Sequence, residues 1–419
     1  MRIALPRYMP MATLVAALAV TASLSPLAAG ADAAATALPQ TVQAWGSNAY
    51  GELGNGTTTD SSLPGRVKLP AGIKLSSARC LLTCLAVTTT GQAYAWGRND
   101  VGEVGDGTTK QRLTPVRVDL PAGVKVTAVR PGNSFSLALT TTGKVLAWGN
   151  NSAGQLGNGT TKSRMKPVPV SLPKGVTVKA ISAGDDDGFA LTSAGRVLSW
   201  GGNEAGQLGT GTTKGRKTPG YVSLAKGTTV TSIAAGSLTG YAVTKKGGLL
   251  AWGENNDGQL GDGTTKQRDK PVRVSLPKGT KVVAAVSGLL HALALTKGGK
   301  VLAWGDNQEG QLGIGTTTTR HRPVFVTLPK GTKVSELAAG KDYSLALTTV
   351  PVEPGPNGTP TTHGLLAWGG NETGQLGTGT TGGSLVPVAP KLSDLIEPMS
   401  VGSGWGSVTS IAICVQQPV

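Results

Sequence analysis

A short segment that begins with Trp-Gly recurs along this chain at a nearly constant spacing. Its tryptophans stand 51, 52, 52, 52, 52 and 64 residues apart, which defines seven copies of a unit of about 52 residues. They are Trp45, Trp96, Trp148, Trp200, Trp252, Trp304 and Trp368. A period of this length is typical of repeat architectures in which each unit packs on its neighbours, so the chain must stack its units side by side.

The apolar runs inside each unit predict short β-strands. They are four to seven residues long and are bounded by Gly, Pro or Thr clusters, as in antiparallel strands joined by turns. Runs such as SLALT and VLAW show no polar alternation and are expected to be buried on both faces. The run PVRVSL alternates Val272 and Val274 with Arg273 and Ser275, which predicts a half-exposed strand. The 62 glycines favour tight turns over long helices.

The two ends of the repeat region are complementary. The N-terminal end, TVQAWG, lacks the SLALT-type strand before it, and the C-terminal end, WGSVTSIAICV, supplies that strand without a following AWG. Pairing these ends would complete a seventh blade and remove the exposed edges of an open stack. The sequence therefore predicts an all-β fold, a seven-bladed β-propeller closed by its N-terminal and C-terminal strands.

The first forty residues differ from the rest of the chain. Arg2 and Arg7 precede an apolar run, and small residues around Ala31 to Ala33 offer a cleavage site, which is the pattern of a secretory signal peptide. An N-terminal membrane anchor is the alternative. We expect a signal peptide at 1–33, a short linker at 34–40 and one propeller at 41–419, secreted or at the cell surface. No transmembrane segment is expected in the mature chain.

The last interval between tryptophans is longer than the others by 12 residues. The excess is a Pro/Gly-rich segment at about 350–361 between two strand-like runs. Loops on rigid scaffolds commonly carry recognition, so this insert is a candidate contact. A tolerated surface insertion is the other interpretation.

The chain has three cysteines, which acquire meaning if the protein is exported. Cys80 and Cys84 occupy the places that Gly340 and Ser344 hold in a later copy. Four residues apart across a turn, they could form a disulfide, or they could be two buried thiols that act as small apolar side chains. Cys414 lies in an apolar run and is left over.

The repeated motif also carries a resemblance. The run W-G-x-N-x-x-G-[QE]-L-G-x-G-T-T, complete at Trp148 to Thr161, and AAGxxYSLALT at Ala338 to Thr348 resemble the regulator of chromosome condensation (RCC) repeat family, here as an exported member of bacterial type. The family implies a seven-bladed propeller. It also implies two alternative activities. One is guanine-nucleotide exchange on the nuclear GTPase Ran, from which export would separate this chain. The other is β-lactamase inhibition, known for a secreted relative.

The loop that follows each tryptophan shares an asparagine three residues on and glycines six, nine and eleven residues on. Glycines at fixed places indicate backbone positions with positive φ or close approach, and an asparagine amide can bond the local backbone. The tryptophans are interpreted as packing plates between blades. A ligand site repeated seven times is the alternative function for this loop.

The clearest difference among the copies is charge. Fourteen and sixteen residues after the tryptophan, the second to fifth copies carry a lysine and an arginine, and the sixth keeps the arginine. These nine residues, which we name the basic band, are Lys110, Arg112, Lys162, Arg164, Lys214, Arg216, Lys266, Arg268 and Arg320. Equivalent positions in a ring lie on one face, so the band predicts a curved basic surface on five blades. With a net formal charge of +16, the chain should attract polyanions.

Catalysis finds little support in the sequence. The three histidines, His291, His321 and His363, have no partner at metal-ligand spacing, and no nucleophile elbow or phosphate loop is present. The acidic run GDDDG at Gly184 to Gly188 lacks the spaced ligands of a calcium loop. We therefore expect a non-catalytic, monomeric binding protein without cofactor or metal. Its partner would be a protein or an anionic envelope polymer, with nucleic acid less favoured.

Two interpretations compete with this one. The basic band could serve only to keep the surface solvated and soluble. An enzyme whose site lies at the propeller channel, built from residues far apart in the sequence, is the alternative of a different class.

Overall fold

The computed structural model describes residues 40–349, 364–392, 396–404 and 406–416. The chain divides into two compact units, residues 1–33 and 34–419, and all described residues belong to the second. The predicted signal peptide, the linker up to residue 39 and the predicted insert lie outside the described residues. In the described ranges every regular element is a strand, and no helix is long and apolar enough to cross a membrane.

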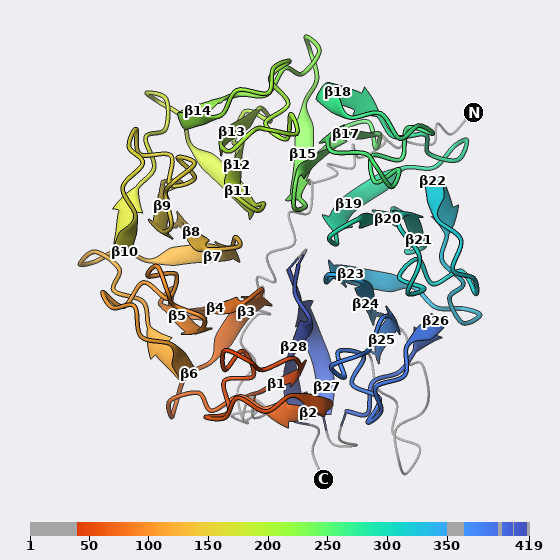
Figure 1. Ribbon diagram of the computed structural model, residues 1–419, viewed down its shortest axis with the longest axis horizontal. Helices are drawn as coiled ribbons and strands as arrows, with labels where there is room; N and C mark the ends of the chain where they lie inside the picture. The colour runs from red at the N-terminus through yellow and green to blue at the C-terminus, as the bar shows by residue number, and fades with distance from the viewer. Residues whose placement is uncertain (1–39, 350–363, 393–395, 405, 417–419) are drawn as a thin grey trace, which may run out of the picture. The chain divides into compact units, whose positions relative to one another are not determined.

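The strands form seven four-stranded antiparallel sheets that follow one another around a ring (Figure 1). Each sheet is one blade, and its first strand lies nearest the axis. From the innermost strand outward, the first two blades are β3 (Leu75–Cys80), β4 (Thr83–Thr88), β5 (Ala93–Gly97) and β6 (Arg112–Arg117), and β7 (Val126–Pro131), β8 (Phe135–Thr140), β9 (Val145–Gly149) and β10 (Arg164–Pro169). The next two are β11 (Val178–Ala183), β12 (Asp187–Thr192), β13 (Val197–Gly201) and β14 (Arg216–Tyr221), and β15 (Val230–Ala235), β16 (Thr239–Thr244), β17 (Leu249–Gly253) and β18 (Arg268–Arg273). The fifth and sixth are β19 (Val282–Ser287), β20 (His291–Thr296), β21 (Val301–Gly305) and β22 (Arg320–Phe325), and β23 (Val334–Ala339), β24 (Tyr343–Thr348), β25 (Gly364–Gly369) and β26 (Ser384–Val388).

The seventh blade joins the two ends of the repeat region. It consists of β27 (Ile396–Gly402), β28 (Thr409–Gln416), β1 (Gln40–Gly46) and β2 (Ser61–Arg66), in that order outward. β1 pairs with β28 along its whole length, from Gln40 opposite Val415 to Gly46 opposite Thr409. This pairing confirms the predicted closure, which covers the edges that an open stack would expose.

The middle two strands of each blade form the core, as their unbroken apolar runs predict. Every residue of β20 and of β21 is buried. The same holds for β8 and β9. Both faces of these strands pack against neighbouring blades, because hydrophobic clusters combine residues from adjacent sheets.

The outermost strand β18 begins and ends earlier than the sequence predicted. β18 spans Arg268–Arg273, so Ser275 lies outside the strand that the PVRVSL run indicated. The strand ends before Ser275 because the N–H of Ser275 donates to the carbonyl of Gly261 at 2.8 Å rather than to β17. The strand starts at Arg268 opposite Gly253 and is irregular between that pair and the next.

Antiparallel order places the loops of every blade on two faces. The loop between the first and second strands and the loop between the third and fourth strands share one face, where the N–H of Arg98 donates to the carbonyl of Leu82 at 2.9 Å. The remaining loops share the opposite face, where the N–H of Thr89 donates to the carbonyl of Lys74 at 3.0 Å. We call the first the tryptophan-loop face, since the segments that follow the repeated tryptophans lie there.

Candidate interaction surface

The repeated tryptophans connect each blade to the one before it. All seven are fully buried. The indole Nε1 of each donates to the backbone carbonyl of the glutamate or glutamine seven residues after the preceding tryptophan. In the middle of the chain Trp200 donates to Gln155 at 2.8 Å, and at the ring closure Trp45 donates to Gln375 at 2.9 Å. The tryptophans are therefore both packing plates and polar links between blades.

The asparagine and glycines of the tryptophan loop hold that loop in shape. The Nδ2 of Asn151 donates to the carbonyls of Thr160 and Lys162, both at 3.1 Å, and its Oδ1 accepts the N–H of Leu156 at 2.9 Å. Gly157 has φ +62°, and a Cβ there would lie 2.8 Å from the ring of Trp200. Because these amide atoms bond within the loop, its repetition serves the architecture of the blades.

The basic band lies along the outer edge of the tryptophan-loop face. Its arginines are the first residues of β6, β10, β14, β18 and β22, and its lysines stand two residues earlier. The four lysines Lys110, Lys162, Lys214 and Lys266 are exposed, and no described residue pairs with their ammonium groups. The backbone carbonyl of each accepts a hydrogen bond from the loop asparagine, at 2.9 to 3.1 Å. The same position of the loop therefore presents a lysine on four consecutive blades.

The arginines of the band are not equivalent. Arg112 and Arg268 form ion pairs with Asp106 and Asp262, the latter at 2.8 Å. Arg216 donates to the carbonyls of Ser199 and Gly220 at 3.0 and 2.7 Å, and burial lowers its pKa.

Arg164 is partly exposed and Arg320 is exposed, and neither pairs with a carboxylate among the described residues. The available charge of the band is therefore the row of four lysines with Arg164 and Arg320.

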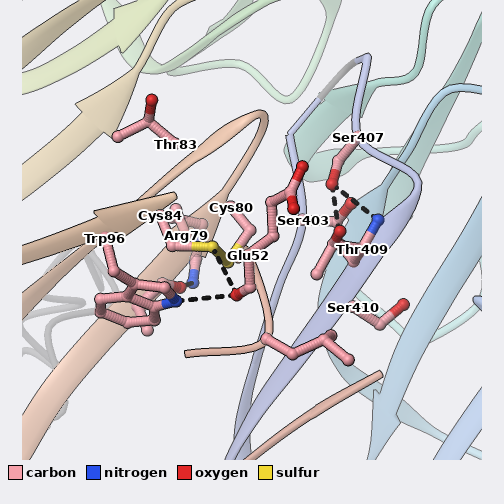
Figure 2. Close-up of a disulfide and its surroundings, with 12 residues drawn as sticks. Glu52, Arg79, Cys80, Thr83, Cys84, Trp96, Ser403, Ser407, Thr409 and Ser410 are labelled. Carbon is pink, nitrogen blue, oxygen red and sulfur yellow. Dashed lines mark hydrogen bonds between the residues drawn. A yellow bond between two sulfur atoms is a disulfide. The ribbon is translucent and has the colours of Figure 1, made fainter. Parts of the chain in front are cut away.

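Cys80 and Cys84 form a disulfide with an S–S distance of 2.03 Å, whereas Cys414 is a buried free thiol (Figure 2). The two bridged residues are directly opposite each other in β3 and β4, and they close the turn that carries Leu81 and Leu82. In Figure 2 the bridge lies beside Trp96 and the backbone of Glu52. The Sγ of Cys84 is 3.2 Å from the Glu52 carbonyl, to which the Trp96 indole donates at 2.7 Å. A bridged sulfur has no proton to donate, so this sulfur contact is not a hydrogen bond.

The alignment of Cys80 with Gly340 is wrong by one residue. Cys80 pairs with Cys84 as Ala339 pairs with Ser344, so the cystine turn is one residue shorter and lacks the glycine. This deletion accounts for the first interval of 51 residues instead of 52. Cys84 does take the place of Ser344, whose hydroxyl donates to the carbonyl of Gln311 at 2.9 Å.

A cavity of about 250 Å³ lies at the axis on the tryptophan-loop face. We call it the axial cavity. The turn between the first two strands of each blade contributes to its lining, which is Leu81, Leu82, Asn133, Asp185, Ser237, Leu289, Lys341 and Gly406. Backbone bonds link neighbouring turns, since Asp185 N–H donates to Ser237 at 3.0 Å and Lys341 N–H to Ser407 at 2.7 Å. Asp185 and Lys341 belong to blades on opposite sides of the ring.

Three buried titratable groups lie near this face. Burial raises the pKa of the Glu52 carboxyl to about 7 and lowers the pKa of His291 to about 3. Burial also raises the pKa of Asp187 well above its usual range, helped by the charges of Asp185 and Asp186, and neither carboxyl oxygen of Asp187 has a hydrogen-bond partner. His291 contacts the Ser344 hydroxyl at 3.0 Å through Nε2. These side chains are enclosed between blades and do not reach solvent.

Within the part of the chain that the structure describes, no group of three or more His, Cys, Asp or Glu side chains could hold a metal ion. The acidic run at Gly184 to Gly188 forms the turn between β11 and β12 and the first two residues of β12. His321 lies in the outer strand β22, and His363 lies outside the described residues.

The model of the RCC1-like domain matches residues 41–412, which include strands of all seven blades. The chain belongs to the RCC1-like domain family. The ultraviolet-B receptor UVR8 of Arabidopsis thaliana is 30% identical over 367 residues, which cover 87% of this chain and 79% of UVR8. This membership confirms the family resemblance of the repeat motif and the propeller fold.

Two solved structures share the fold of this RCC1-like propeller. Human WBSCR16 superimposes with a TM-score of 0.78 at 24% identity, over 91% of this chain and 100% of that chain. Yeast RCC1 (Prp20), in its complex with Kap60, gives a TM-score of 0.77 at 23% identity, over 96% of each chain.

The axial cavity was not predicted from the sequence. Its lining residues follow the first strand of each blade and differ from copy to copy, from Leu81 and Asn133 to Asp185 and Lys341. That variation was a usable signal, because loops carry recognition more often than the strands they join.

Proposed function

We propose that this RCC1-like propeller is a secreted, non-catalytic binding protein that holds an anionic partner on the row of lysines in its basic band. The partner is an extracellular or envelope protein with an acidic surface, or an anionic envelope polymer. The observation that carries the proposal is the repetition of Lys110, Lys162, Lys214 and Lys266 at one place of four consecutive blades, exposed and without carboxylate partners in the described structure.

The geometry favours this function for two reasons. Each lysine carbonyl is bonded to a buried loop asparagine, so the row is spaced by the fold and its backbone needs no ordering on binding. Neighbouring like charges that are not neutralised within the protein attract a ligand with several negative groups more strongly than a single ion. The structural relative yeast RCC1 is known in complex with Kap60, which suits a protein partner for a propeller of this kind.

The experiment uses two variants of equal charge. The first reverses the row of lysines through K110E, K162E, K214E and K266E. The second reverses the same number of exposed lysines in the turns of the opposite face, through K174E, K226E, K278E and K330E. The two variants have the same net charge and differ in the face that is changed.

Each protein is immobilised and offered the envelope fraction and secreted proteins of its own organism, at low and at high salt. We expect the first variant to lose most of the bound anionic material and the second to keep it, with binding weakened by salt in each case. Equal loss in both variants would mean that only net charge matters. Retention in both variants would refute a role for the row.

A further inference from the structure

Two arginines occupy the same place on neighbouring innermost strands. Arg79 in β3 stands opposite Leu85, and Arg130 in β7 stands opposite the equivalent Leu137. Both bend in the same way, since the Nη1 of Arg79 donates to the Ala78 carbonyl at 2.8 Å and the Nη1 of Arg130 donates to the Val129 carbonyl at 2.7 Å. The two guanidinium groups therefore lie near each other where the innermost strands meet.

One carboxylate forms an ion pair with the first of these two cations. Glu336 of β23 forms an ion pair with Arg79 at 2.9 Å, and its other oxygen accepts the N–H of Val401 at 3.2 Å. Arg79 further donates to the Val401 carbonyl at 3.1 Å. Glu336 and Arg79 thus connect three blades of the ring.

No carboxylate among the described residues pairs with Arg130. The equivalent positions of the five other innermost strands are uncharged: Ser182, Ala234, Val286, Ala338 and Gly402.

Arg130 therefore lies in a partly desolvated place without an ion-pair partner among the described residues, and the charge of Glu336 acts on it only from beyond ion-pair distance. Burial and then the charge of Arg79 lower the pKa of Arg130 to about 10, so it stays protonated at neutral pH. A guanidinium has five N–H donors, and the described structure uses one of them. A desolvated cation with free N–H donors beside a second cation binds an anion strongly.

We propose that Arg130, with Arg79 beside it, binds a small oxyanion at the axis of the ring. The ligand is a free carboxylate or phosphate, or a small molecule that carries one, because a planar guanidinium binds two oxygens of such a group at once. The axial cavity is the entrance, since its lining residues Leu81 and Asn133 follow Arg79 and Arg130 by two and three residues. This site is separate from the row of lysines at the outer edge.

The test measures the melting temperature of the full protein while inorganic phosphate replaces chloride at constant ionic strength, with acetate in a parallel titration. Wild-type protein should show a saturating rise with at least one of the two anions, and the tighter one identifies the ligand group. Arg130→Ser, which installs the residue of the next blade, should weaken the apparent affinity about ten-fold or more. Arg130→Lys keeps the charge without the planar fork and should bind with intermediate affinity.

A control separates this site from the outer surface. The variant with all four lysines of the row reversed should keep the phosphate effect of the wild type. The proposal is overturned if neither anion gives a saturating rise in the wild-type protein. It is also overturned if Arg130→Ser or Arg130→Lys binds as tightly as wild type, or if reversal of the four lysines abolishes the effect.

Discussion

Replacing Glu52 with glutamine should stabilise the protein at neutral and alkaline pH. Glu52 is 1% exposed, and its Oε2 accepts the N–H of Tyr50 at 2.8 Å. Five other blades have glutamine at this place, where the amide oxygen accepts the same bond, as in Gln155, which accepts the N–H of Ala153 at 3.0 Å. The E52Q variant should therefore keep this contact and lose only the ionisation of a buried acid.

The magnitude follows from the pKa. Burial raises the pKa of Glu52 from 4.5 to about 7 in the folded protein. The folded state holds the proton more tightly than the unfolded state, so wild-type stability is greatest below pH 4.5 and falls as the pH rises through about 7. The full difference corresponds to about 3 kcal/mol. For a domain of roughly 380 residues this is a gain of about 4 °C in melting temperature.

The assay is thermal unfolding of wild type and E52Q between pH 5 and pH 8.5. The difference should be small at pH 5 and approach its full size at pH 8.5. Glu103 provides the matched control, because it holds the same place but forms an ion pair with Arg98 at 3.1 Å. E103Q loses that pair and should lower the melting temperature. An E52Q difference that does not change with pH, or an equal gain in E103Q, would refute the argument from burial.

Three further predictions follow from single contacts. Alkylation of the denatured, unreduced protein should label only Cys414, and three labelled thiols would exclude the disulfide. The double variant C80S and C84S should lower the free energy of unfolding by about 2 kcal/mol, because it opens a five-residue loop. W252F should lower the free energy of unfolding by about 1–3 kcal/mol more than W45F, measured by denaturant unfolding. The Gln375 carbonyl that accepts the Trp45 indole also accepts the Ser410 hydroxyl, whereas the Gln207 carbonyl that accepts the Trp252 indole has no second donor in the described structure. Equal losses in the two variants would contradict this. Burial lowers the pKa of His291 from 6.5 to about 3, so the contribution of His291 to stability is complete above pH 6.5 and is lost as the pH falls toward 3. The stability cost of H291T should therefore shrink by about 3 kcal/mol between pH 7 and pH 4. A cost that does not change with pH would show that the imidazole is solvated.

Most of the fold could be predicted because each blade repeats the same local physics. The tryptophan, the loop asparagine and the glycines at fixed distances are visible in every copy, and the incomplete ends around Trp45 and Cys414 indicate the closure. The end of the outer strand β18 was harder to predict, since it depends on the bond from Ser275 to Gly261 in the loop between β17 and β18. The one-residue deletion before Cys84 was visible as an interval of 51, but only strand pairing locates it in the turn.

The candidate surface was predictable in position and less so in charge. Equal spacing from the tryptophan places the band on one face, as the structure has it. Which arginine has its charge offset depends on the residue ten after the tryptophan. Asp106 and Asp262 form ion pairs with their arginines, whereas Asn158 leaves Arg164 unpaired. The pattern is visible in the sequence when the residues ten and sixteen after each repeated tryptophan are compared together.

The paired arginines separate two roles that net charge combines. An arginine held by Asp262 cannot attract a distant anion strongly, because the carboxylate cancels most of its field beyond a few ångströms. The lysine two residues earlier keeps its full charge at the same blade edge. Removing the aspartate should therefore increase anion binding even though no basic residue is added. D106N with D262N raises the positive charge of the band at the two places where the structure cancels it, and binding of the anionic partner should become tighter and more sensitive to salt. Unchanged affinity would mean that the partner contacts only Lys162, Lys214 and their immediate surroundings.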